Sequence, residues 1–142
     1  MTWWMYALLG AIMWGVHYPL LGRVMTVASP LTTVYITIAP LVLAFPFLYK
    51  TLSTEVGNVI SADISIRISA FIMMFTGIIG TVAVYRAIGA SNATVASLIE
   101  IAYPIFVALF SYAVFREVHL NWEAALGGVL IFVGTTLVII SR

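Results

Sequence analysis

Uncharged, strongly apolar stretches divide the chain into five segments, separated by short runs that hold the charged residues. The predicted spans cover about residues 3–22, 31–49, 68–86, 92–115 and 122–140. With a rise of about 1.5 Å per residue, each is long enough to cross a bilayer core as a helix. Backbone groups inside lipid must be satisfied within the segment, which favours helices for stretches that are apolar on all sides. The pattern predicts an all-α membrane protein, a bundle of five transmembrane helices in one domain over residues 1–142.

Two segments need a separate interpretation. The longest connection, Thr51–Ile66, mixes polar and apolar residues and predicts at most a short interfacial helix. The first apolar segment has no basic stretch before it and no small-residue cleavage site after it. We therefore expect it to be a membrane span and not a signal peptide.

Composition supports this class and excludes others. Hydrophobic residues make up 63% of the chain and charged residues 8%, far from the balance of a soluble domain. A net charge of +1 argues against nucleic acid as a partner. The absence of cysteine excludes disulfides, thiol catalysis and cysteine-ligated metals. No hydrolytic or phosphate-binding motif is present, so we expect no enzyme, no cofactor and no metal site.

The basic residues give little indication of orientation. Five spans place the termini on opposite sides, here face A (N-terminal) and face B. Each face carries three basic residues, which are Lys50, Arg67 and Arg116 on A, and Arg23, Arg86 and Arg142 on B. The positive-inside rule predicts orientation from a difference in basic residues between the two faces, and here the numbers are equal. Two alternatives therefore stay open. The chain inserts one way with a weak bias, or copies insert both ways and form antiparallel dimers.

Glu100 and His17 are the main candidates for chemistry. A carboxylate inside a span costs a few kcal/mol, about 2.5 or more, unless it is paired or neutral. Glu100 is therefore interpreted either as a proton-coupling or cation-binding group, or as a packing acid bonded to a nearby hydroxyl or amide. His17 of the first span lies at a similar depth towards face B. A His17–Glu100 relay is a further hypothesis.

Other residues extend this candidate site. Tyr103 lies three residues after Glu100, on the same helical face. With Trp14 and Tyr18 it could line an aromatic cavity for organic solutes. Arg86 is interpreted as an interface anchor or as a charge partner of Glu100. Further tyrosines that could join the cavity are Tyr35 and Tyr85.

Prolines and glycines suggest hinges and packing surfaces. A proline leaves the carbonyl four residues earlier without its helical partner, which permits bending. The hinge candidates are Gly15, Pro19, Pro40 and Pro104, with Pro46 as a further interior proline. In the last span, small residues form a stripe suited to close packing or dimerisation, namely Ala124, Gly127, Gly128 and Gly134.

The order of these features resembles a known family. The stretch Ala90–Val138 leads through small residues and Glu100 to Pro104, continues with Phe115-Arg-Glu117, and ends in a glycine-rich helix. It is similar to the EamA domain of the drug/metabolite transporter superfamily, as is the Trp14–Gly15 pair. The resemblance implies a five-helix EamA-like repeat, transport of small metabolites or drugs, and a structural role for Glu117.

The resemblance also implies a partner. Members of the family mostly contain two inverted repeats, whereas this chain holds one. We expect a secondary transporter, an exporter acting as a homodimer in a prokaryotic inner membrane, with the lipid bilayer and a small-molecule substrate as its other partners. The alternative is an accessory or assembly subunit that transports nothing itself.

Overall fold

The computed structural model describes residues 2–117 and 121–141. Its helices are α1 (Trp3–Val24), α2 (Pro30–Ile60), α3 (Ile64–Ala90), α4 (Ala93–Glu100), α5 (Tyr103–Phe110), the π-helix η1 (Ser111–Phe115) and α6 (Trp122–Ile140). With α4, α5 and η1 taken as one segment, 5 segments are long and apolar enough to cross a membrane. The chain is a multi-pass integral membrane protein, as predicted. Arg142, one of the basic residues counted on face B, lies outside the described residues.

Side-chain caps explain where three helices begin. The hydroxyl of Ser29 accepts from the backbone N–H of Thr32 at 3.2 Å, and Pro30 follows as the first residue of α2. Asn92 caps α4 in the same way, and Asn121 caps α6, each at 2.9 Å. Such caps satisfy backbone donors that have no partner inside the helix.

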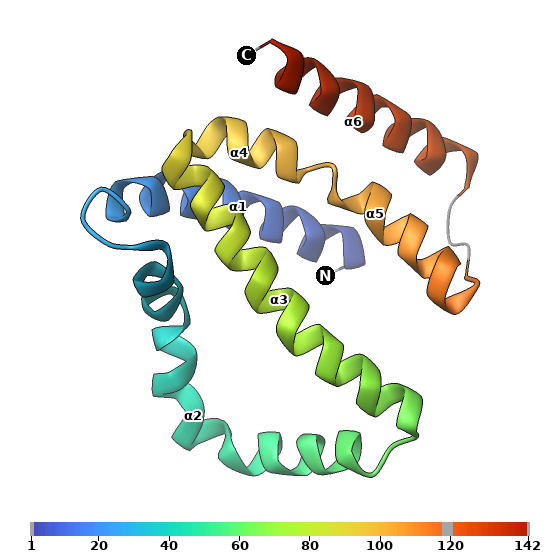
Figure 1. Cartoon of the computed structure of the whole chain (residues 1–142). Coiled ribbons are helices and arrows are strands. Elements are labelled where there is room, and N and C mark those ends of the chain that lie inside the picture. Colours follow the sequence, from blue (N-terminus) through green and yellow to red (C-terminus); the bar gives the residue numbers. More distant parts are fainter. Residues whose placement is uncertain (1, 118–120, 142) are drawn as a thin grey trace.

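Only one of the interior prolines ends a helix. The predicted fourth span is interrupted where Pro104 removes a donor and its ring crowds the carbonyl of Glu100. The α-helix therefore stops at Glu100 and resumes at Tyr103. By contrast, α1 continues past Pro19. Helix α2 contains Pro40 and Pro46, and it is visibly bent (Figure 1).

The connection between the second and third spans differs from the prediction. Residues 51–60 continue α2, and only a short turn separates its end at Ile60 from the start of α3 at Ile64. Nothing between Tyr49 and Ile60 stops a helix, because Gly57 is only a weak breaker. The hydroxyls of Ser53 and Thr54 bond back to the carbonyl of Lys50.

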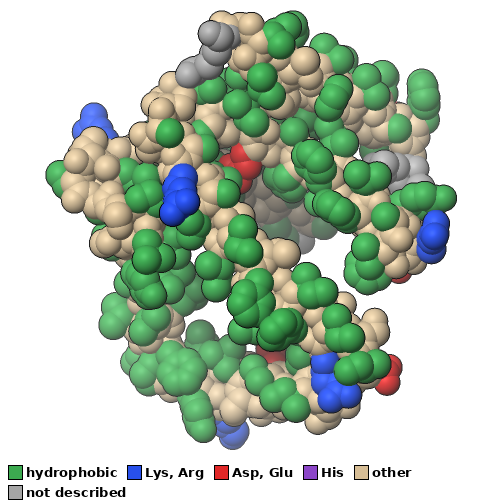
Figure 2. Space-filling model, viewed as in Figure 1, with side chains coloured by type: hydrophobic (Ala, Val, Ile, Leu, Met, Phe, Trp, Pro, Cys, Tyr) green, Lys and Arg blue, Asp and Glu red, His purple; other side chains and the backbone are tan. Residues whose placement is uncertain are grey.

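The buried core is small and lies at one end of the bundle. Leu21, Tyr85, Ile88 and Ala96 form it, from the last turns of α1 and α3 and the first turn of α4. From this end α3 diverges from α1 and α4, while α6 packs on α4 and α5 (Figure 1). Most other large apolar side chains are exposed (Figure 2). This surface is expected where lipid is the solvent.

Candidate functional site

A groove of about 910 Å³ lies mainly between α1 and α4. Most of its wall is apolar or aromatic, and its polar residues are few. The lining residues are Ala7, Gly10, Ala11, Trp14, Gly15, Tyr18, Pro19, Ala93, Thr94, Ser97, Leu98, Glu100, Ile101 and Tyr103. Figure 2 shows acidic atoms at the edge of a hollow near the centre of this view. This size and lining suit a small organic solute.

Glu100 is held at the wall of this groove by a neighbouring helix. The hydroxyl of Tyr18 donates to its Oε2 at 2.5 Å, and both side chains are partly buried. A short O–H···O contact of this kind is typical of a hydroxyl bonded to a carboxylate. Glu100 ends α4, where Pro104 interrupts the span, so the acid and the helix break share one level.

His17 belongs to a second set of polar contacts. Its Nε2 lies 3.1 Å from the hydroxyl of Tyr85, which is only 1% exposed. The same hydroxyl lies 3.0 Å from Oγ1 of Thr37, and Thr37 donates to the carbonyl of Thr33 at 3.0 Å. These bonds join α1, α3 and α2. The hydrogen bonds of His17 and Glu100 thus go to different partners, Tyr85 and Tyr18, and no direct contact between the two is described.

The remaining predicted residues fall into two groups. Trp14 packs against His17 and Tyr18, with ring centroids 5.3 and 5.4 Å apart. It lines the groove with Tyr103, whose side chain is exposed. Arg86 is exposed, and it is not among the residues that line the groove or bond to Glu100. The structure therefore brings Trp14 and Tyr103 to the site and leaves Arg86 apart from it.

Sequence reasoning did not find the residues that connect α2 to this site. Thr33 and Thr37 are four residues apart and so share one face of α2, which was the available signal. Threonine is common in membrane helices, where it usually bonds to its own helix. Thr37 does this as well, and nothing in the pattern distinguishes its additional contact with Tyr85.

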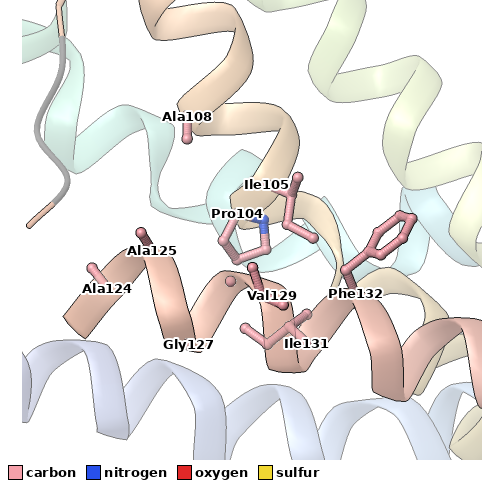
Figure 3. Close-up of a pocket in the computed structure, with 10 residues that line it drawn as sticks. Pro104, Ile105, Ala108, Ala124, Ala125, Gly127, Val129, Ile131 and Phe132 are labelled. Atoms are coloured by element: carbon pink, nitrogen blue, oxygen red, sulfur yellow. The ribbon is translucent and has the colours of Figure 1, made fainter. Parts of the chain in front are cut away.

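A second groove, of about 550 Å³, lies between α5 and α6. Pro104, Ile105 and Ala108 of α5 form one wall (Figure 3). The α6 wall includes three of the four stripe residues, namely Ala124, Gly127 and Gly128. A Cβ atom added at Gly127, Gly128 or Gly134 would meet no other atom within 4 Å. The three glycines of the stripe are thus not used for close helix packing within the described chain.

The chemistry available to the first groove is that of one carboxylate, hydroxyls and aromatic rings. No group of three or more His, Asp and Glu residues that could hold a metal ion occurs within residues 2–117 and 121–141. Glu100 can exchange a proton or attract a cation, and the rings offer apolar contact.

Comparison with known proteins gives one result. The sequence model of the EamA-like transporter family matches residues 1–140. The search of curated proteins finds no match, and neither does the search of solved structures.

Proposed function

The chain belongs to the EamA-like transporter family, and on this premise we propose that it is a secondary transporter that exports small organic metabolites or drugs. It works as a homodimer in a prokaryotic inner membrane, and Glu100 couples transport to protons. The observation that carries the proposal is the groove between α1 and α4, with a carboxylate at its wall inside the membrane segment.

The position of Glu100 supports proton coupling. A carboxylate in a membrane is stable when protonated or when it binds a cation or donor. Tyr18 supplies one donor, on a helix different from that of Glu100. Exchange of a proton for solute at Glu100 would change this contact between α1 and α4. That change links proton binding to movement around the break before Pro104.

The lining of the groove favours neutral or cationic solutes over anions. It includes one carboxylate and three aromatic side chains, Trp14, Tyr18 and Tyr103, and no lysine or arginine. An anion would be repelled by an ionised Glu100, and desolvation inside the membrane would increase that cost. Aromatic faces attract cations and contact apolar groups.

The homodimer is supported by the surface of α6 and by the distribution of basic residues. The glycines of the small-residue stripe on α6, which are not used for close packing within the described chain, offer a place for close approach by a second copy. The even division of basic residues supports an antiparallel arrangement. Single cysteines at Ser61, in the turn after α2, and at Val27, in the turn after α1, report the orientation, because the chain has no other cysteine. An impermeant thiol reagent on intact cells should label about half of each variant for dual insertion. Labelling of one variant alone would overturn the antiparallel dimer.

The transport test uses proteoliposomes that contain a pH-sensitive dye and carry an imposed pH gradient. Ethidium serves as a cationic aromatic probe. In proteoliposomes with the wild-type protein, we expect its addition to cause a flux of protons across the membrane, which the dye records as a change of internal pH. Glu100→Gln should abolish this flux, because the amide keeps the shape but cannot titrate. Glu55→Gln, at an exposed acid on α2, is the matched control and should behave as wild type. Equal fluxes from both variants would contradict the coupling role.

The same preparation separates the transporter from an accessory subunit. A stable homodimer with solute-dependent proton flux supports transport. A purified chain that gives no flux with any probe, and that retains an unrelated protein in fixed proportion, would favour the accessory role instead.

A further inference from the structure

The polar contacts between α1, α2 and α3 have a direction that can be deduced from their donors. A threonine hydroxyl and a tyrosine hydroxyl each own one proton, and a backbone carbonyl owns none. The chain of contacts ends at the carbonyl of Thr33, which can only accept. The direction of every bond before it is therefore determined from this end.

One assignment satisfies all three contacts at once. Thr37 gives its proton to the carbonyl of Thr33, so its oxygen must accept from Tyr85. Tyr85 then donates its only hydroxyl proton to Thr37, so its oxygen must accept a hydrogen bond from Nε2 of His17. The opposite direction would leave a contact without a proton. Burial makes that costly, because Thr33 is 2% exposed and Tyr85 1%.

We propose that these bonds fix His17 as the tautomer that carries its proton on Nε2, so that Nδ1 is a proton-binding site in its own right, separate from Glu100. The inference goes beyond the proposed function and does not depend on transport. Nδ1 has no hydrogen-bond partner among the described residues. Its lone pair is therefore free to accept, while Nε2 stays bonded to Tyr85.

The groups around His17 define its surroundings on each packed helix. Tyr85 faces it from α3, and Trp14 and Tyr18 contact its ring from α1 itself. On α4, Glu100 is bonded to the adjacent Tyr18. Helix α2 contributes Thr37, which does not titrate. A proton bound at Nδ1 would thus lie on the residue next to Tyr18 of the Tyr18–Glu100 contact, and binding it would not require the bonds that join α1, α2 and α3 to break.

The tautomer can be measured directly by nitrogen NMR of the imidazole ring. The chain has two histidines, so His119→Asn leaves His17 as the single signal. The protein is labelled with nitrogen-15 histidine and purified into lipid nanodiscs without solute. We expect one set of signals in alkaline buffer, with the proton on Nε2. Acidification should add the second proton at Nδ1.

Thr37→Val provides the sharpest variant. Without the threonine oxygen, Tyr85 is free to donate its proton to Nε2, and His17 should convert to the tautomer protonated on Nδ1. Thr37→Ser keeps the hydroxyl and should retain the original tautomer. Thr136→Val removes an equivalent hydroxyl-to-carbonyl bond on α6 and is the matched control, with no change expected.

Two results would overturn the inference. One is a wild-type His17 with its proton on Nδ1. The other is a Thr37→Val protein whose tautomer is unchanged. If Thr37→Val does not fold, Tyr85→Phe is the replacement test. It removes the hydroxyl that accepts from Nε2 of His17, so both tautomers of His17 should then be present. A single Nε2–H form in Tyr85→Phe would contradict the role of Tyr85. None of these NMR measurements depends on transport activity. The proposed function can therefore fail while the assigned His17 tautomer holds, and the reverse.

Discussion

The side of the molecule formed by α1–α4 and the side formed by α5 and α6 are held together by different means. On the first side, side-chain hydrogen bonds connect α1 to α3 and α4, and connect α3 to α2. The apolar core lies on the same side. On the second side, the groove between α5 and α6 is lined by apolar and small residues alone. The side-chain bond described for α6 to another helix runs from Thr135 to the carbonyl of Leu98, at 3.4 Å.

This difference bears on how a membrane helix bundle holds its shape. Lipid tails are as apolar as leucine, so burial of apolar surface gives little force between helices. Helices joined by hydrogen bonds have a specified register, because each bond requires one geometry. Helices joined only by apolar contact can slide or separate at lower cost. The first side is therefore suited to a site of fixed geometry, and the second to contact with a partner.

The largest effect on stability is expected at the core of the first side. Leu21→Ala should lower the free energy of unfolding by roughly 2–5 kcal/mol, because the residue is 3% exposed and its loss leaves a cavity. Leu137→Ala on α6 is the control, at a side chain 56% exposed, and should change it by about 0.5 kcal/mol or less. Unfolding by SDS in mixed micelles measures both. Equal losses would remove the contrast between the two sides.

The next effect concerns the bond between α1 and α4. Tyr18→Phe deletes the donor to Glu100 and should cost about 1–3 kcal/mol, because the carboxylate loses a partner. Tyr35→Phe is the matched control, since that side chain is 64% exposed, and its cost should lie within about 0.5 kcal/mol of zero. The same SDS unfolding reports both values. A Tyr18→Phe protein as stable as wild type would show that this contact does not hold α1 to α4.

The sequence predicted the architecture better than the connections within it. Long apolar segments identified the five spans because lipid imposes a length on each. Pro104 was one of several hinge candidates, and the pattern did not indicate that it alone would interrupt an α-helix. His17 and Glu100 were found because they are polar residues inside apolar spans. Their actual partners, Tyr85 and Tyr18, depend on how the helices rotate and cross. Those angles are set by packing over the whole bundle, and a pattern along one segment does not contain them.

A third prediction concerns the stripe on α6. Gly128→Leu should raise the free energy of unfolding of one chain by roughly 0.5–1 kcal/mol, because leucine is the better helix former and nothing lies within 4 Å of the added Cβ. If a second copy packs on the stripe, the dimer should dissociate about tenfold more readily, which corresponds to about 1.4 kcal/mol. Gly77→Leu on α3 is equally free of neighbours and is the control. Dimer populations measured by energy transfer between labelled copies should fall for the α6 variant alone. An unchanged population would place the dimer contact elsewhere.

The smallest effect is expected where α1 meets α3. All ten glycines lie in the described ranges, and only at Gly22 and Gly89 would an added Cβ meet another atom within 4 Å. At Gly89 this atom is the terminal methyl carbon of Met25, at 2.7 Å. Because that end of the side chain is flexible, Gly89→Ala should force only a rotamer change. Alanine also stabilises a helix over glycine, by roughly 0.5–1 kcal/mol in an interior and by less at Gly89, because α3 ends at Ala90.

The two contributions oppose each other, so Gly89→Ala should change the free energy of unfolding by less than about 0.5 kcal/mol. A double-mutant cycle with Met25→Ala separates them. In the shortened background, Gly89→Ala should be stabilising, since the clash is gone and the helical preference remains. A large loss in both backgrounds would mean that the backbones of α1 and α3, and not the Met25 side chain, limit the space at their crossing. The crossing of α1 and α3 would then be more rigid than the flexible Met25 contact alone implies.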